Sequence, residues 1–283
     1  MKLNSQTAEI FIPDGSLQET ALSRTTHMAI SAHQDDIEIM AVEPVIECFQ
    51  QSNKWFTGVV LSDGRGSPRD GQYSKYSDEE MRLVRIKEQK KAAIIGEYTA
   101  QVLLDFPSMQ IKDGSYFQCI EDIAQILNQC QPQFLYTHNL ADKHDTHVAT
   151  ALRVIAAIRS LPIEKRPQKL YGCEVWRSLD WMLDEEKVYL NVSDQEGLQT
   201  ALLGIFDSQI NGGKRYDLAT IGRRRANATF SESHGVDVST GLSYAMDLTP
   251  LIQDDHLRES SFVTKRIHNF AKDVENRIQR LSK

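Results

Sequence analysis

The sequence predicts an α/β fold with a Rossmann-like, mostly parallel sheet that helices cover on both faces. Short apolar runs bounded by turn residues alternate along the chain with segments of helical periodicity. Such alternation produces right-handed βαβ crossovers and a parallel sheet. The polar stretches "AHQDD" and "THNLADKHDTH" each directly follow an apolar run. Sheets of this kind bind their ligands beyond the carboxyl ends of the strands.

Each element of this fold has its own signal in the sequence. The segment 78–96 has acids in its first turn, apolar residues at helical spacing and a terminal glycine, so it is the clearest helix. The other expected helices are 117–130, 147–160, 194–209 and about 256–282. The expected strands are 27–32, 56–62, 101–106, 133–138, 169–176 and 187–193. We expect residues 1–283 to form a single domain.

Composition and charge exclude several classes of protein. Lys and Arg are scattered and the formal net charge is −7, so we expect no nucleic-acid partner. No apolar run is long enough to span a membrane, and the N-terminus lacks a signal-peptide pattern, so we expect a cytoplasmic protein without a membrane partner. The four cysteines form no C-x-x-C pair, which argues against a zinc ribbon or a redox motif. No G-x-G-x-x-G or P-loop is present.

Histidines and aspartates recur at matching spacing where the two polar stretches lie. His33 and Asp36 are three residues apart, as are His144 and His147, and such pairs can face one way. Two imidazoles and one carboxylate are the ligand set of a catalytic zinc. A shared cation would also offset the repulsion between Asp35 and Asp36. Asp35 could then act as a general base, and His144 could stabilise an oxyanion or protonate a leaving amine.

A resemblance to a known family strengthens this interpretation. The stretch "AHQDDIEIM" resembles the signature A-H-P-D-D-[EI]-E of the LmbE-like, or PIG-L, zinc-dependent N-deacetylases, and "DKHDTH" is similar to their second signature, D-x-H-P-D-H. The segments "VVLSDGRGS", "RIKEQKKAAIIG", "ALLGIFDSQ" and "FSESH" resemble further family segments in the same order. The resemblance extends roughly from Met28 to Glu232.

The resemblance implies a role for each residue of the two signatures. His33, Asp36 and His147 would ligate zinc, although the same donors also suit Fe²⁺. Asp35 would be the general base, and His144 would stabilise the tetrahedral intermediate. The substrate would be an N-acetylated sugar or glycoconjugate, such as an N-acetylglucosamine conjugate, and the products would be acetate and a free amine.

The resemblance also implies that Arg85 contacts the substrate. From the sequence alone, Arg85 could instead form a salt bridge on the helix surface with Glu88 or Glu80. Relatives often have a substrate-binding aspartate near Ser108, and Asp113 is the residue here that could take that role.

Two positions depart from the family signatures. Gln34 replaces a proline, so we expect a less rigid loop whose ligand geometry survives. Thr146 replaces an aspartate that orients the histidine at the position of His144. A threonine cannot supply charge, so the basicity of His144 should fall unless Asp142 or Asp145 takes over.

Two other functions are compatible with the sequence. A sugar-binding protein without turnover would explain Thr146 and Gln34. A zinc hydrolase of another amide or of a phosphoester would be favoured if Arg65 and Arg69 meet an anionic substrate. The amphipathic segment at about 256–282 also offers a surface for a homo-oligomer.

Overall fold

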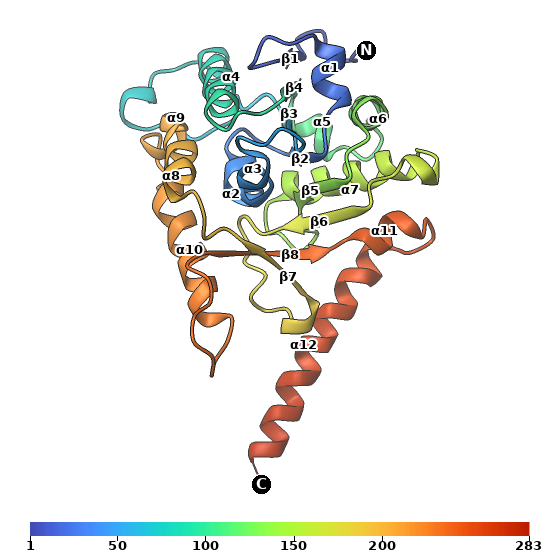
Figure 1. The fold of residues 1–283 in the computed structure, drawn as a ribbon, viewed down its shortest axis with the longest axis vertical. Coiled ribbons are helices and arrows are strands. Elements are labelled where there is room, and N and C mark those ends of the chain that lie inside the picture. Colours follow the sequence, from blue (N-terminus) through green and yellow to red (C-terminus); the bar gives the residue numbers. More distant parts are fainter. Residues whose placement is uncertain (283) are drawn as a thin grey trace.

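The computed structural model describes residues 1–282, and its strands form one eight-stranded sheet within that range (Figure 1). The strand order is β1-β4-β3-β2-β5-β6-β8-β7. The five central strands, which are β4, β3, β2, β5 and β6, run parallel to one another. The strands β1 and β8 are antiparallel to their neighbours. The strands are β1 (Glu9–Phe11), β2 (His27–Ser31), β3 (Phe56–Ser62), β4 (Ala100–Phe106), β5 (Phe134–His138), β6 (Lys169–Cys173), β7 (Lys187–Asn191) and β8 (Leu242–Asp247). This confirms the predicted fold class.

Helices cover both faces of the sheet. One face carries α1 (Gln18–Ser23), α5 (Ser108–Lys112), α6 (Gln118–Cys130), α7 (Asp145–Arg159), α11 (Thr249–Gln253) and the start of α12 (Glu259–Leu281). The other face carries α2 (Asp36–Met40), α3 (Val42–Cys48), α4 (Asp78–Ile95), α8 (Glu196–Gly204), α9 (Asp207–Ile210) and α10 (Tyr216–Phe230). Each face therefore has its own apolar core.

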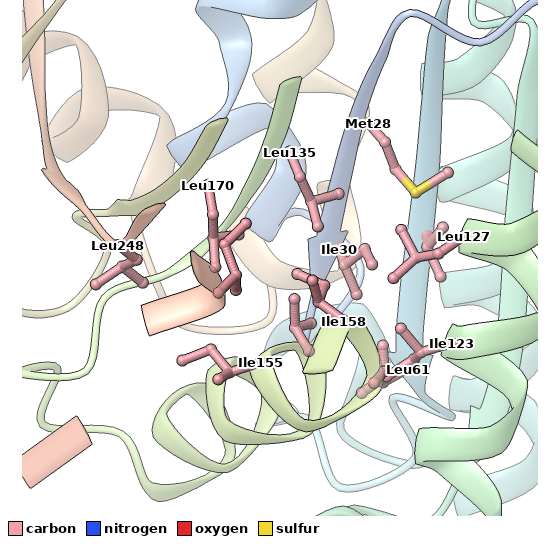
Figure 2. Packing of buried hydrophobic residues seen from close by; sticks show 14 of the residues in the cluster. Met28, Ile30, Leu61, Ile123, Leu127, Leu135, Ile155, Ile158, Leu170 and Leu248 are labelled. Carbon is pink, nitrogen blue, oxygen red and sulfur yellow. The ribbon is translucent and has the colours of Figure 1, made fainter. Parts of the chain in front are cut away.

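The strand β2 shows why both faces must be covered. All its residues are buried; Met28 and Ile30 point into one core and Ala29 into the other. Figure 2 shows the first of these cores, where Met28 and Ile30 meet Leu127 of α6 and Ile158 of α7. A strand buried on both sides has a continuous apolar sequence, which is the pattern that predicted it.

Most predicted elements are present with small shifts at their ends. The helix α4 begins with a capping box between Ser77 and Glu80, as its sequence indicates. The predicted helix 194–209 is instead two helices, α8 and α9, because the backbone leaves the helical region at Phe206 (φ −84°, ψ 56°). The sequence did not predict the strands β1 and β8, the helix α10, or the short helices α1, α2, α3, α5 and α11.

The C-terminal helix α12 projects from the body of the molecule (Figure 1). Of its side chains, only Phe262 and Val263, both near its start, are buried. Among the described residues, no helix is both long enough and apolar enough to cross a bilayer.

Candidate metal centre and substrate pocket

The predicted site residues meet where the strand order of the sheet reverses direction. From β2 the chain continues outward through β3 to β4, and it then returns to β5 on the other side of β2. The carboxyl ends of β2 and β5 therefore diverge into two separate loops, and a crevice forms between them. The β2 loop supplies His33, Asp35 and Asp36, and the β5 loop supplies His144 and His147.

Three side-chain atoms in this crevice form a nearly equilateral triangle. His33 Nδ1 lies 3.1 Å from Asp36 Oδ2 and 3.2 Å from His147 Nε2, and the remaining side measures 3.3 Å. Ligands about 2.0–2.1 Å from a tetrahedral zinc lie about 3.3 Å from one another. The donor set and its spacing therefore fit a divalent metal ion such as zinc.

A fourth buried histidine lies beside this triangle and was not predicted to belong to the site. His138, the last residue of β5, stacks on His147 with the ring centroids 3.9 Å apart, and its Nε2 lies 3.4 Å from Asp36 Oδ2. However, His138 Nε2 accepts a hydrogen bond from the backbone N–H of Ala32 at 2.9 Å. Its lone pair is therefore engaged, so His138 supports the side chains of the triangle and is not free to ligate an ion. Its position at the end of the strand beside β2 was the available signal in the sequence.

Charges around the triangle hold Asp36 ionised. Burial alone would raise the pKa of Asp36, but the neighbouring His147 and His138 bring it well below its usual value. Burial likewise opposes a charge on His147, yet Asp36 and Asp142 raise the pKa of His147 to about 9. Asp142 Oδ2 lies 3.3 Å from His147 Nδ1. Asp142 thus directs the other ring nitrogen of His147 toward the triangle, as carboxylates behind metal-binding histidines do.

Asp35 is held beside the triangle in an unusual backbone conformation. Its φ is 88°, a region that non-glycine residues rarely adopt. Its backbone N–H donates to Gln89 Oε1 at 3.2 Å, and its carboxylate lies 3.5 Å from Arg85 Nη2. Burial raises the pKa of Asp35 to about 8, with Arg85 opposing and Asp36 adding to the shift.

Arg85 points into the site and not along the helix surface. It is 2% exposed, donates to the backbone oxygen of Gln34, and lies within ion-pair distance of Asp35 only, not of Glu88 or Glu80. The surface salt-bridge alternative is therefore wrong. Arg85 Nη1 is buried without a hydrogen-bond partner. A free guanidinium donor that lines a cavity is suited to bind an oxygen of a ligand.

His144 lies next to two side chains of the triangle, His33 and His147. Its ring packs edge-on against His33, with the centroids 5.0 Å apart, and lies nearly parallel to Trp176 at 6.1 Å. His144 Nδ1 is buried without a partner, so neither Asp142 nor Asp145 orients it. Burial, helped by the charge of His147, lowers the pKa of His144 to about 4. The pKa of His144 is thus shifted downward, which is the direction expected when Thr146 replaces an aspartate.

A cavity of about 380 Å³ opens over these groups. Its walls include all the predicted site residues except His147, which is buried. The walls also contain Ser108, Thr146, Trp176, Gln209, Lys214 and Tyr216. Gly64 forms part of the wall at φ 70°, and a Cβ there would lie 2.4 Å from Gln34 Oε1. Only glycine therefore fits this turn without moving Gln34.

Gln34 itself is fixed by its side chain. Its Nε2 donates to the Ser62 carbonyl oxygen at 3.0 Å, and it is 1% exposed. These contacts replace part of the restraint that a proline would give. Asp113, in contrast, does not line the cavity; its carboxylate accepts hydrogen bonds from Ser115 at 2.7 and 2.9 Å.

The loop arginines do not face the cavity. Arg65 pairs with Asp63 at 2.6 Å, Arg69 pairs with Asp78 at 2.5 Å, and neither lines the cavity. The segment Asp207–Gln209 does reach the cavity, since Gln209 forms part of its wall. Ser208 holds this segment by donating to Glu88 at 2.6 and 2.8 Å.

Comparison with known proteins finds a family profile that matches part of the chain and solved structures that share its fold. Residues 28–158 match the sequence profile of the family described as PIG-L: GlcNAc-PI de-N-acetylase. This range contains every site residue predicted from the two signatures and Arg85. No curated protein sequence is significantly similar to the chain.

Several solved structures share the fold. They include the conserved protein TT1542 from Thermus thermophilus (16% identity, TM-score 0.61, 83% of this chain and 99% of that one). The 4-carboxy-2-hydroxymuconate hydratase GalB from Pseudomonas putida KT2440 matches at 15% identity and a TM-score of 0.58 (79% and 96%). The N,N'-diacetylchitobiose deacetylase from Pyrococcus horikoshii matches at 16% identity and a TM-score of 0.57, over 82% of this chain and 88% of that one. A hydratase and a deacetylase thus share this architecture, so the fold alone does not decide the reaction.

Proposed function

Residues 28–158 form a PIG-L family domain, and from this premise we propose that the protein is a metal-dependent hydrolase that removes the acetyl group of an N-acetylated sugar conjugate. The observation that carries the proposal is the triangle of His33, Asp36 and His147, with Asp35, His144 and Arg85 around it. We take the metal to be zinc, with Fe²⁺ as the alternative, and N-acetylglucosamine as the sugar.

Each group has a distinct role in this reaction. The triangle of His33, Asp36 and His147 would hold a divalent cation, which would supply Lewis-acid polarisation of the acetamide carbonyl and would lower the pKa of water toward neutrality. A cation at the triangle would favour the carboxylate form of Asp35, and in that form Asp35, aligned by Gln89 and Arg85, would accept the proton of the attacking water. His144, whose pKa of about 4 leaves it neutral, would donate a hydrogen bond that stabilises the developing oxyanion, and it would pass the proton that Asp35 takes from water to the departing nitrogen.

Arg85 positions the substrate. Its free Nη1 donates to a sugar hydroxyl or to the acetamide oxygen, while Nη2 keeps Asp35 in place. Binding and orientation of this kind reduce the entropy that is lost on the way to the transition state.

The whole chain bears on the domain organisation and the cellular compartment of the proposed enzyme. We infer one catalytic domain spanning residues 1–283, since elements from both ends share the sheet and its two cores. All four cysteines are buried free thiols, which supports a reducing, cytoplasmic compartment. A small-molecule partner is enough for the reaction; a homo-oligomer is compatible with it.

Metal content and acetate release test the proposal together. We expect about one zinc or iron per chain, acetate from N-acetylglucosamine conjugates, and loss of both metal and turnover in His147→Ala. Asp35→Asn should keep the metal but lose at least about 10²-fold in kcat. Asp113→Asn, the same change outside the cavity, should behave as wild type. Metal without acetate from any conjugate would point to another amide, a phosphoester, or hydration. A chain that binds no metal on reconstitution would refute the proposal.

A further inference from the structure

A second cavity, of about 310 Å³, adjoins the metal-site cavity and is strongly basic. The two cavities share Ile39, Val175, Trp176, Lys214 and Tyr216 in their walls. Five basic residues line the second cavity, against one acid, Glu174. The chain as a whole has a net charge of −7, so this concentration of positive charge is local.

Four of these cations have no acidic partner. Within residues 1–282, no carboxylate lies within ion-pair distance of Lys143, Lys214, Arg223 or Arg224, whereas Arg215 pairs with Asp217 at 2.8 Å. Arg223 donates instead to the backbone oxygen of Val175. Positive side chains that gather at one cavity without acids repel each other, and a bound anion relieves that repulsion.

A buried charge lies at the base of the same cavity. Arg224 is 3% exposed, and its guanidinium donates to the backbone oxygens of Glu38 and Ile39 and to Gln199. Its Nε has no hydrogen-bond partner. The acid in the wall, Glu174, accepts hydrogen bonds from a buried asparagine side chain and from two backbone N–H groups, so it does not pair with the lysines.

Trp176 connects the two cavities. Its ring lies nearly parallel to His144 at 6.1 Å, and the ammonium groups of Lys214 and Lys143 lie 5.4 and 5.9 Å from its centroid. Its backbone N–H donates to Asp142 Oδ2, the same oxygen that contacts His147. Trp176, whose ring lies near both lysines, is thus also held by Asp142, a residue that contacts His147.

From this arrangement we propose that the second cavity binds an anionic group, a carboxylate or a phosphate, on the part of the substrate attached to the N-acetylated sugar. The sugar occupies the metal-site cavity, the connecting atoms pass Trp176 and Tyr216, and the anion meets Lys143, Lys214 and Arg223. Ammonium groups on flexible stems and a guanidinium with free donors both suit such oxygens. This inference rests on the proposed deacetylation for its substrate, but the anion site itself does not require turnover.

The test compares three glycosides of N-acetylglucosamine that differ in the para substituent of the aglycone: the neutral phenyl and the anionic 4-carboxyphenyl and 4-phosphophenyl. In the wild type we expect kcat/KM for a charged glycoside to exceed that for the neutral one by about tenfold at low salt, since exposed ion pairs contribute about 0.2–1 kcal/mol each. The advantage should shrink in about 0.5 M salt, where exposed charges are screened beyond about 4 Å. The larger of the two ratios identifies carboxylate or phosphate as the group bound.

Two double variants with equal charge changes locate the effect. In Lys143→Gln/Lys214→Gln the charged-to-neutral ratio should fall to about one third of its wild-type value or less. Lys91→Gln/Lys265→Gln, which removes two exposed lysines elsewhere, should keep the wild-type ratio. Equal hydrolysis of all three glycosides by the wild type, or a ratio that survives in the first variant, would overturn the inference and leave the deacetylase proposal intact.

A binding measurement separates the two proposals. Dissociation constants of the corresponding free amines, measured by calorimetry, need no turnover. If no glycoside releases acetate, tighter binding of the charged amines by the wild type, lost in Lys143→Gln/Lys214→Gln, would still support the anion site. Equal binding of charged and neutral amines would overturn it.

Discussion

The side-chain oxygen of Gln89 accepts a hydrogen bond from the backbone N–H of Asp35 at 3.2 Å. Gln89 is fully buried on α4, and its Nε2 donates to Glu38 Oε1 at 2.9 Å and to Gln101 Oε1 at 3.2 Å. Glu38 Oε1 in turn accepts from Tyr98. The strained backbone of Asp35 is thus held by a network that reaches from the site into the second core.

Gln89→Leu should lower activity without removing the metal. Leucine has about the same size but offers no acceptor, so Asp35 can leave its φ of 88° and its carboxylate moves from the attacking water. A displacement of about 1 Å commonly costs about 10²-fold in rate. We expect kcat to fall by about 10- to 100-fold at unchanged metal content, measured by acetate release and elemental analysis.

Lys87→Leu, an exposed position on the same helix, is the matched control for that variant. It should keep wild-type kcat. If Gln89→Leu also keeps wild-type kcat, the network does not position Asp35.

Particular residues show how far the sequence could anticipate this site. Strand ends place His33, Asp35 and Asp36 in one loop and His144 and His147 in another, and a parallel sheet brings such loops together. The role of Gln89 could not be foreseen, because nothing local marks a buried glutamine that contacts a residue 54 positions earlier. The contacts of such residues depend on how α4 packs against the loop after β2.

The same limit applies to the elements that were missed. The strand β8 pairs with β6, which is far away in the sequence, so its partner cannot be read from local pattern. After the break between α8 and α9, Ser208 donates to Glu88, again a long-range contact that helical periodicity does not reveal. Local signals were enough to predict the helices with caps, such as α4, and the strands that are buried on both faces.

Asp105→Asn should destabilise the fold. Asp105 accepts hydrogen bonds from Arg82 at 2.8 and 2.5 Å, both residues are buried, and its φ is 59°, which asparagine also tolerates. The variant therefore adds no backbone strain, but it removes the main counter-charge of Arg82. Removing one partner of a buried pair costs about 3–5 kcal/mol. Urea denaturation should show a loss near the lower value, since Arg82 also contacts Glu79 at 2.7 Å.

Asp78→Asn breaks a surface pair with Arg69 and provides the comparison. It should cost less than about 1 kcal/mol. Equal losses from Asp78→Asn and Asp105→Asn would show that burial of the Arg82 pair contributes nothing to stability.

Glu43→Gln should stabilise the protein above neutral pH. Burial, with the nearby Glu47, raises the pKa of Glu43 to about 7 from a usual value of 4.5. The folded state therefore holds a proton between those values that the unfolded state releases, so stability falls as the pH rises from 4.5 to 7. Glutamine removes this penalty and can still accept from the Tyr136 hydroxyl. Because Glu43 is only partly buried by surface area, we expect a gain of about 1 kcal/mol at pH 8 and almost none at pH 4.

Urea midpoints of wild type and Glu43→Gln at both pH values give this difference. Glu164→Gln, at an exposed position, is the control and should shift neither midpoint. A gain for Glu43→Gln that is as large at pH 4 as at pH 8 would mean that ionisation of Glu43 is not its cause.

Removing residues 267–283 should leave both fold and activity nearly intact. This part of α12 carries apolar side chains that are exposed, among them Phe270 at 39%, Ile278 at 60% and Leu281 at 74%. Of the described residues 267–282, Asn269 alone donates a hydrogen bond to the body, to Glu186, and the truncation removes it. We therefore expect a loss of about 1 kcal/mol or less in urea denaturation and unchanged acetate release. Phe262→Ala, at the buried start of α12, should cost more, about 3 kcal/mol.

The same truncation tests whether α12 joins copies of the chain. An apolar stripe along an exposed helix can pack against a second copy, in which case folding and assembly are coupled. If wild type sediments as a dimer and the truncated chain as a monomer with a loss well above that of Phe262→Ala, the stripe is an interface. If both sediment as monomers with equal stability, residues 267–283 are dispensable for the fold, and the catalytic domain is complete at its buried anchor, Phe262 and Val263.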